Sequence, residues 1–391
     1  MNNADHMNRL LEDLVELLEI PPSYYQKAAD RYRSLGDWFH RPVSAVREHE
    51  PDVYPQGSFR YGTVIRPLLR TEVYDLDLVC QLTLSKHHMS QKALKELVGG
   101  EVKSYAEAHD FKEPAEEKRR CWRLNYQDDV SFHMDILPSV PDDEAFKALL
   151  VSQGIPRELA DEAVAITDRD HPSYTRITPG WPRSNPRGFA GWFEAKMRPV
   201  AQPRIKLLVE NRAYASVDNV PSYEWKTPLQ RSIQILKRHR DVMFRDDPNQ
   251  KPISMVITTL AAHAYGGETD LHAALSNILD GMPQFVRQTR PRVPNPVNPA
   301  EDFADRWATN PRLEENFWAW HTQAQADLAN LRRPLSEDQL QESLRTKFGA
   351  DLPADSARTI AALTGAAAPV VPERQPTVHI QSAPKPWTSD A

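Results

Sequence analysis

Two aspartates stand in a segment that could do metal-dependent chemistry. Asp75 and Asp77 are separated by one residue in YDLDLVCQL, where polar and apolar residues alternate. Alternation with a period of two predicts a strand, so both carboxylates project from one face while Leu76 projects from the other. Two adjacent anions repel each other, and a divalent cation with a preference for hard oxygen ligands, Mg²⁺ or Mn²⁺, relieves that repulsion.

A third aspartate occurs in a later apolar run. Asp135 lies in FHMDILP, with Phe132 and Met134 on the expected core side and Asp135 opposite. If this strand lies next to the first, three carboxylates converge on one point. Such a set can hold two metal ions about 4 Å apart, one activating an attacking hydroxyl and one supporting a leaving pyrophosphate.

A glycine and serine motif precedes the aspartates. In PQGSFRYGT, Gly57 and Ser58 come just before a short predicted helical turn, whose free backbone N–H groups and hydroxyl can hold a triphosphate. Taken alone, this motif also fits an ordinary tight turn with a cap, and surface strands often carry two acids by chance. The combined spacing of the motifs indicates nucleotidyl chemistry.

The elements that must position these residues follow from periodicity. Two helices are predicted at 7–20 and 23–40, interrupted by Pro21-Pro22, which cannot continue a helix. Next come the strand around Asp75, a helix at 91–109, and strands at 119–126 and 130–137, which together indicate a mixed α/β domain.

The second half of the chain is predicted to be mainly helical. Proline-rich segments at 172–186 and 291–299 indicate loops or linkers, Thr227-Pro228 is typical of a helix start, and 254–265 forms another apolar helix. After about Gly349 the chain is rich in proline and alanine, so we expect a flexible tail.

Composition excludes several classes of protein. The chain has 391 residues, of which 40% are hydrophobic and 26% charged, enough for a large core. A net charge of −6 argues against gripping extended nucleic acid. No segment has the roughly 18 to 20 consecutive apolar residues of a membrane span, and the start of the sequence is unlike a secretion signal, so we expect a cytoplasmic protein. Only two cysteines, Cys80 and Cys121, are present, which excludes a disulfide framework.

These motifs together resemble those of a known family. PQGSFRYGT, YDLDLVCQL, SFHMDILPSVP, SNPRGFAGWF, LQRSIQILKRHRD, KPISMVITTLAAHAY and NPVNPAEDFADRW are similar to segments of the bacterial cGAS/DncV-like nucleotidyltransferases of CBASS anti-phage systems, within the polymerase-β-like superfamily. The resemblance covers roughly residues 54–307. It implies an α+β, bilobed fold: N-terminal helices (1–45) packed across both lobes, a nucleotidyltransferase core with a mixed sheet (46–200), a helical lobe (201–348) and a flexible tail (349–391).

The resemblance also implies roles for individual residues. The metal ligands would be Asp75, Asp77 and Asp135, and the triphosphate site would be lined by Gln56, Gly57 and Ser58. Lys237 would contact donor phosphates, and Ser254 would bond to a nucleotide phosphate. The alternatives are a solvated helix residue for Lys237 and an N-cap for Ser254.

Two further segments keep open roles. Asn185, Pro186 and Arg187 either approach the base or form a structural turn, and either Asp302 or Asp305 reaches a base edge or caps a helix. For His87, His88 and His239, solvated or capping roles are favoured over a metal site, because no partners stand at ligand spacing.

The implied activity is synthesis of a cyclic di- or trinucleotide from ATP, GTP or other nucleoside triphosphates, whose product activates a separate effector. The alternative is a toxin or a tRNA- or protein-modifying nucleotidyltransferase with the same carboxylates, and a silent nucleotide-binding scaffold is disfavoured by the intact aspartates. In some relatives a ubiquitin-transfer-like enzyme conjugates the C-terminus, and the tail ending at Ala391 is compatible with that. The bases, linkage and ring size are not determined by these motifs.

Overall fold

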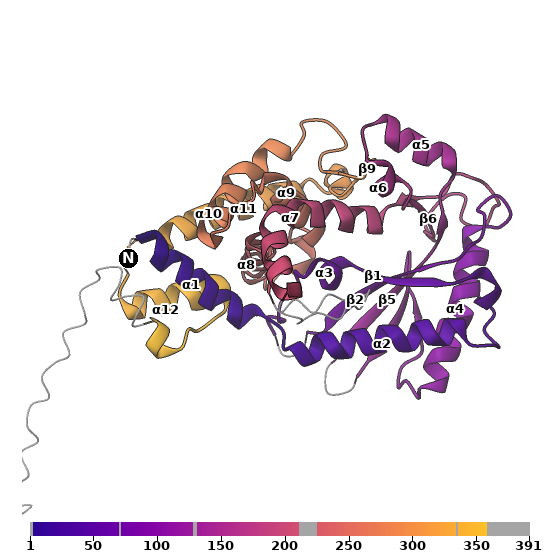
Figure 1. The fold of residues 1–391 in the computed structure, drawn as a ribbon, viewed down its shortest axis with the longest axis horizontal. Coiled ribbons are helices and arrows are strands. Elements are labelled where there is room, and N and C mark those ends of the chain that lie inside the picture. The colour runs from indigo at the N-terminus through magenta and orange to yellow at the C-terminus, as the bar shows by residue number, and fades with distance from the viewer. Residues whose placement is uncertain (1–2, 70–71, 128–130, 211–224, 334, 358–391) are drawn as a thin grey trace, which may run out of the picture.

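The computed structural model describes residues 3–69, 72–127, 131–210, 225–333 and 335–357, which form a sheet-containing lobe and a helical lobe (Figure 1). The helices are α1 Asn3–Leu18, α2 Pro22–His40, α3 Gly57–Tyr61, α4 Gln91–Ala108, α5 Glu144–Ser152, α6 Arg157–Ala160, α7 Pro186–Glu210, α8 Pro228–Met243, α9 Ser254–Ala264, α10 Leu271–Gly281, α11 Arg312–Leu331 and α12 Glu337–Phe348. The strands are β1 Asp52–Gln56, β2 Tyr74–Gln81, β3 Glu116–Glu117, β4 Trp122–Tyr126, β5 Phe132–Pro141, β6 Val164–Ile166, β7 Arg183–Ser184, β8 Pro294–Asn295 and β9 Asn298–Asp302. None of the helices in these ranges is long and apolar enough to cross a membrane.

The main sheet is mixed, as the sequence predicts. Its order is β1-β2-β5-β4-β3, with β6 pairing β5 and β7 pairing β6. Strands β2 and β5 run parallel, whereas the other pairs in this sheet are antiparallel. The long strand β5 pairs with β4 through its first half and with β6 through its last residues, so it forms the centre of the lobe.

One face of this sheet is covered by helices. Apolar residues of β2 and β5, among them Leu76 and Met134, are fully buried in the same core as residues of α2 and α4. The alternate residues of the two strands point to the opposite face. This arrangement leaves the aspartates on the face that is turned away from α2 and α4.

The N-terminal helices pack across both lobes, as expected. The leucines of α1 belong to the core of the helical lobe, and α1 contacts α8 and α10, whereas α2 contacts α4 and β1 (Figure 1). The chain leaves the first helix before Pro21, and Pro22 starts the second, where a missing N–H costs nothing. The break at the proline pair therefore lies between α1 in the helical lobe and α2 in the sheet lobe.

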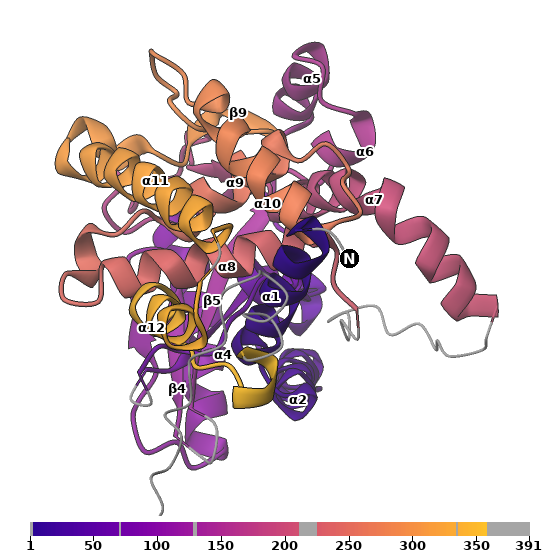
Figure 2. The ribbon, with the colours of Figure 1, turned by 90° about the vertical axis from the view of Figure 1, so that its left-hand side faces the viewer.

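Helix α8 is the centre of the helical lobe. Figure 2 shows it among α1, α10, α11 and α12, and it contacts each of them. A reciprocal pair of hydrogen bonds between Thr227 and Gln230 caps its start, as the Thr227-Pro228 signal predicts. The expected boundary between the lobes at residue 200 lies inside α7, whose Phe189 and Phe193 pack in the core of the helical lobe.

Two expectations about irregular segments are wrong in part. The proline-rich stretch 291–299 includes β8 and the first two residues of β9, and the two strands form a hairpin. The expected flexible tail is ordered from 350 to 357, because Leu352 and Ala357 are buried against the helical lobe and Gln341 is hydrogen-bonded to the backbone of Leu352 at both its N–H and its C=O. The rest of the expected tail, 358–391, lies outside the described residues.

Candidate active site

The three aspartates are brought together by strand register. In the parallel pair of β2 and β5, Asp77 stands opposite Asp135, and Asp75 stands opposite His133. The prediction that the two strands are neighbours is therefore confirmed. Because parallel neighbours in register point their side chains to the same face, the carboxylates share one surface.

Gly57 is required where it approaches Asp77. Its φ is +69°, and a Cβ added to it would lie 2.3 Å from Oδ2 of Asp77. Any other residue would be strained in the left-handed conformation and would also push the carboxylate away. The glycine thus allows the turn of α3 to rest directly on the catalytic face of β2.

The electrostatics of Asp77 indicate a site that lacks positive charge. Burial, together with the neighbouring carboxylates of Asp75 and Asp135, raises its pKa to about 7, although Arg123 and Lys237 act in the opposite direction. A carboxylate that is buried beside two like charges is stabilised in its ionised form by a bound cation.

An arginine that the sequence analysis did not single out balances this charge. Arg123, on β4, is directly opposite Asp135 and donates two hydrogen bonds to it, each 2.7 Å long. Its Nη2 is 3.9 Å from Oδ1 of Asp75, and Nδ1 of His133 is 3.5 Å from the same oxygen. The signal was present in the alternation of WRLNY, which places Arg123 away from the buried Trp122 and Leu124.

The three aspartates offer carboxylate oxygens, which are the ligands that hard divalent cations such as Mg²⁺ and Mn²⁺ prefer. Among the described residues, no three histidine, cysteine, aspartate or glutamate side chains are arranged so that they could hold an ion as they stand. Asp135 is instead paired with Arg123. Metal binding at the three aspartates therefore requires that Asp135 exchange this arginine for the ion.

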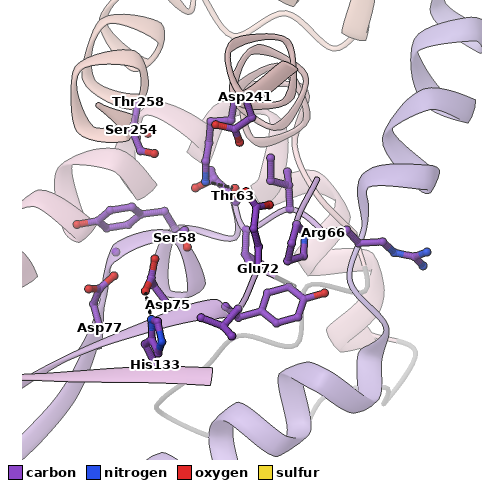
Figure 3. A pocket seen from close by; sticks show the side chains of 18 of the residues that line it. Ser58, Thr63, Arg66, Glu72, Asp75, Asp77, His133, Asp241, Ser254 and Thr258 are labelled. Atoms are coloured by element: carbon purple, nitrogen blue, oxygen red, sulfur yellow. Dashed lines mark hydrogen bonds and ion pairs between the residues drawn. The ribbon is translucent and has the colours of Figure 1, made fainter. Parts of the chain in front are cut away.

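A cavity of about 780 Å³ opens on one side of the aspartates. In Figure 3, Asp75 and Asp77 lie below Ser58, while Ser254 and Asp241 belong to the opposite wall, which comes from the helical lobe. That wall also contains three cations, namely Lys237, Arg240 and Lys251. The cavity thus has carboxylates at one end and positive charge at the other, which suits a triphosphate whose metal lies on the aspartates.

Lys237 and Ser254 lie in this wall, and their contacts with phosphate stay predictions. Lys237 is buried, and its Nζ donates a hydrogen bond of 2.8 Å to the carbonyl of Thr63, so the alternative of a solvated residue is wrong. Burial, with a smaller contribution from the nearby Arg240, lowers the pKa of Lys237 to about 7. The N-cap of α9 is Ile253, so Ser254 is not the cap, and its hydroxyl accepts a hydrogen bond of 2.9 Å from Arg240.

A second cavity, of about 310 Å³, lies on the other side of Asp77. Asp135 and Gln56 line this cavity, whereas Asp75 and Ser58 line the larger one. Gln56 and Ser58 thus line different cavities, with Gly57 between them in the walls of both, and a contact of Gln56 with the triphosphate stays a prediction. Both cavities share the residues Gly57, Tyr61, Asp77 and Met255.

The residues with open roles divide between structural contacts and the smaller cavity. Arg187 forms two hydrogen bonds with Asp52. The side chain of Asn185 accepts one from the backbone N–H of Gly188 at the start of α7, but Asn185 and Pro186 also line the smaller cavity, so their approach to a base stays a prediction. The Asp302 carboxylate accepts from three backbone N–H groups, those of Arg292, Val293 and Ala304.

The histidines have similar structural partners. His87 contacts Asp143, and the buried His239 contacts Asp327.

Within the described part of the chain, Asp302 and Asp305 are absent from the walls of both cavities, whereas the adjacent Glu301 lines the smaller one.

Comparison with known proteins agrees with this geometry. Residues 51–138, which include β1, α3, β2 and most of β5, match the family model described as "Cyclic GMP-AMP synthase DncV-like, nucleotidyltransferase domain". A "c-di-GMP synthase" of Roseivirga ehrenbergii is 27% identical over 355 residues, which cover 90% of this chain and 86% of that protein. The "Cyclic dinucleotide synthase CdnG" of Bradyrhizobium diazoefficiens is 25% identical over 88% of this chain and 81% of its own length.

Solved structures share the fold. The Bradyrhizobium diazoefficiens CdnG in complex with GTP aligns with a TM-score of 0.63 and 22% identity, covering 92% of this chain and 99% of that one. A Vibrio cholerae DncV mutant in complex with ATP, GTP and a folate aligns with a TM-score of 0.55 and 15% identity, covering 90% and 88%. Residues 51–138 thus match a DncV-like nucleotidyltransferase domain, and the chain is similar along most of its length to proteins named as cyclic dinucleotide synthases.

Proposed function

We propose that this nucleotidyltransferase joins nucleoside triphosphates into a cyclic oligonucleotide. The observation that carries the proposal is the pair of cavities on either side of Asp77, which share Gly57, Tyr61 and Met255 and so meet at the carboxylates. Two nucleotides bound in them would have their reacting groups at the same place. The relatives named as cyclic dinucleotide synthases support this reading.

The reaction would be phosphodiester formation. A ribose hydroxyl of one nucleotide attacks the α-phosphorus of the other, the bond to pyrophosphate breaks, and the hydroxyl proton passes to solvent. The resulting linear intermediate must then turn round and react a second time to close the ring. Because both steps are the same chemistry, one set of carboxylates serves both.

The chain's own residues would divide this task by cavity. Asp75, Asp77 and Asp135 would hold Mg²⁺ or Mn²⁺, which supplies activation of the hydroxyl and support of the leaving group when bound. Ser58, Lys237 and Ser254 would bind and orient the triphosphate from the walls of the larger cavity. Gly57 would keep the turn of α3 close to Asp77.

The test of this function is the double substitution Asp75→Asn with Asp77→Asn. It removes two charges with little change of volume, so the protein should melt no lower than the wild type while product formation falls at least ~10³-fold. Pyrophosphate release and mass analysis of the products measure the activity. Substantial synthesis by the folded double variant would refute the site, and label transferred to RNA or protein would favour the macromolecule-modifying alternative.

The biological setting belongs to the same proposal. The product would activate a separate effector in anti-phage defence, in a cytoplasm that supplies the nucleotides. Among the structural neighbours, CdnC of Escherichia coli MS115-1 is seen in a complex with HORMA. For this chain we propose instead that a ubiquitin-transfer-like enzyme acts at the C-terminus, and attachment of a partner to Ala391 in cell extract would be detected by mass analysis.

A further inference from the structure

The walls of the smaller cavity differ in kind from those of the larger one. Apart from the catalytic end, most of its lining is apolar, from Leu137, Ile166, Phe189, Met255 and Phe303. Five arginine and lysine residues line the larger cavity, whereas among the described residues the smaller one has only Arg120, together with Glu301. A carboxylate among apolar groups repels phosphate but suits a flat body with hydrogen-bond donors, such as a nucleobase.

Glu301 is held in place by the hairpin of β8 and β9. Nδ2 of Asn295 donates a hydrogen bond of 2.8 Å to its Oε2. Asn295 is only 2% exposed, so one oxygen of the carboxylate is fixed by a buried amide. Burial raises the pKa of Glu301, whereas Asn295 and Arg120 favour its ionised form.

The basic residue of this wall is bonded to a carboxylate other than that of Glu301. Arg120 lines the same cavity, but its Nε donates a hydrogen bond of 3.0 Å to Oδ2 of Asp168. Glu301 therefore lines the cavity as a hydrogen-bond acceptor whose orientation is set by Asn295. An acceptor fixed in this way beside a reaction site selects among ligands by the donors that they offer.

The four bases differ in the donors on their pairing edge. Guanine presents two adjacent donors, N1–H and the 2-amino group, which match the two oxygens of an ionised carboxylate. Adenine and cytosine each present an amino donor beside an acceptor nitrogen, and uracil presents one N–H between two carbonyls. An ionised carboxylate meets a repulsive acceptor in each of these three cases, because it cannot donate.

We propose that Glu301 reads the pairing edge of guanine in the smaller cavity, so that the nucleotide bound there is a guanine nucleotide. This inference rests on the proposed function, since it assigns a base to one of the two nucleotides that meet at Asp77. It also selects Glu301, rather than its neighbours Asp302 and Asp305, as the acid of this segment that contacts the base.

The experiment uses the full chain with Mg²⁺ and an equimolar mixture of GTP, ATP, CTP and UTP. Glu301→Gln keeps an oxygen that can accept from Asn295 but removes one acceptor and the charge. We expect the preference for GTP over ATP, expressed as the ratio of their kcat/KM values, to fall at least about tenfold, the value of one bidentate base contact. The matched control is Asp305→Asn, which removes a charge from an exposed residue of the same segment and should keep the wild-type ratio.

A substrate analogue tests the same contact without a substitution. Inosine triphosphate lacks the 2-amino group, so the wild type should bind it at least about fivefold more weakly than GTP, and Glu301→Gln should bind both about equally. Thermal melting of each variant shows whether the hairpin is intact. If Glu301→Gln does not fold, the wild-type comparison of inosine triphosphate with GTP decides alone.

The outcomes separate this inference from the function on which it rests. An unchanged preference in folded Glu301→Gln, or equal wild-type binding of inosine triphosphate and GTP, overturns the role of Glu301 even if cyclic products form. Absence of any cyclic product from the wild type overturns the proposed function, and the binding comparison of the two triphosphates still tests Glu301.

Discussion

At the scale of single residues, the site is a balance of charges held at close range. Gly57 allows the turn of α3 to approach Asp77, and Arg123 is bonded to Asp135 while it also lies near Asp75. Lys237 stands across the larger cavity with its ammonium on a backbone carbonyl. If the aspartates hold metal and the larger cavity holds a triphosphate, as proposed, Arg123 and Lys237 are the cations that these ligands would meet.

Arg123 competes with the metal for Asp135. We predict that Arg123→Gln lowers the melting temperature of the metal-free protein, because three neighbouring carboxylates lose their nearest cation. The increase in melting temperature on adding Mn²⁺ should be larger in the variant than in the wild type, since the ion no longer has to displace a guanidinium. Arg119→Gln, which breaks a pair with Asp168 instead, is the control and should respond to Mn²⁺ as the wild type does. A smaller Mn²⁺ response in Arg123→Gln would contradict the competition.

Lys237 makes triphosphate binding depend on pH. Its pKa is about 7 in the free protein, and a bound anion raises that pKa because it favours the ammonium form. Affinity for a non-hydrolysable triphosphate should therefore be constant below the free pKa and fall by roughly tenfold per pH unit above it, until the pKa of the complex is reached. Titration calorimetry on both sides of neutrality measures this slope. Lys237→Met should bind the triphosphate weakly and without this pH dependence. If the variant keeps the same slope, the proton belongs to another group.

At the scale of elements, one face of α8 fixes the loop that follows α3. Side chains spaced by about one helical turn donate hydrogen bonds to carbonyls at the end of α3 and in this loop, namely Gln230 to Tyr61, Gln234 to Val64 and Lys237 to Thr63. The same loop lines the larger cavity, so the helical lobe positions part of the catalytic lobe through buried polar contacts. Buried polar contacts of this kind are costly to break, because the carbonyl is left without a partner.

This contact predicts the effect of a single substitution. Gln234→Leu removes the 2.7 Å hydrogen bond to Val64 and leaves a buried carbonyl unpaired, so the free energy of unfolding should fall by about 1 to 3 kcal/mol. Denaturant unfolding measures the change. Gln325→Leu, at an exposed hydrogen bond between α11 and Asp280, is the control and should lie within about 0.5 kcal/mol of the wild type. Equal stabilities of the two variants would show that the loop is held by other contacts.

At the scale of the whole molecule, two cores are joined around the cavities. The core of the sheet lobe includes α2, and that of the helical lobe includes α1, so the N-terminal helices connect the lobes on one side while α8 connects them at the site. The chain returns to the helical lobe after α12, where Leu352 and Ala357 are buried. The larger cavity has walls from both lobes and therefore depends on how the two cores are held together.

The C-terminal segment gives a prediction with an internal control. A chain ending at residue 357 should keep the wild-type melting temperature and basal synthesis, because the remainder is a proline- and alanine-rich segment with few groups to bury. A chain ending at residue 349 loses the buried Leu352, which should lower the free energy of unfolding by about 1.5 to 3 kcal/mol. Thermal melting and pyrophosphate release compare the two chains. Equal melting temperatures for both would show that 350–357 contributes nothing to the fold.

The sequence by itself determined the local elements and the type of chemistry. Alternation around Asp75 and Asp135 predicts the two strands, and Pro21-Pro22 and Thr227-Pro228 mark a helix break and a helix start, because these signals act within a few residues. Only the tertiary structure decided which strands are neighbours, that Arg123 meets Asp135, and that Glu301 rather than Asp302 lines a cavity. Strand pairing and burial depend on residues far apart in the chain, and a charged residue in an alternating strand has the same local pattern whether it faces solvent or a catalytic carboxylate.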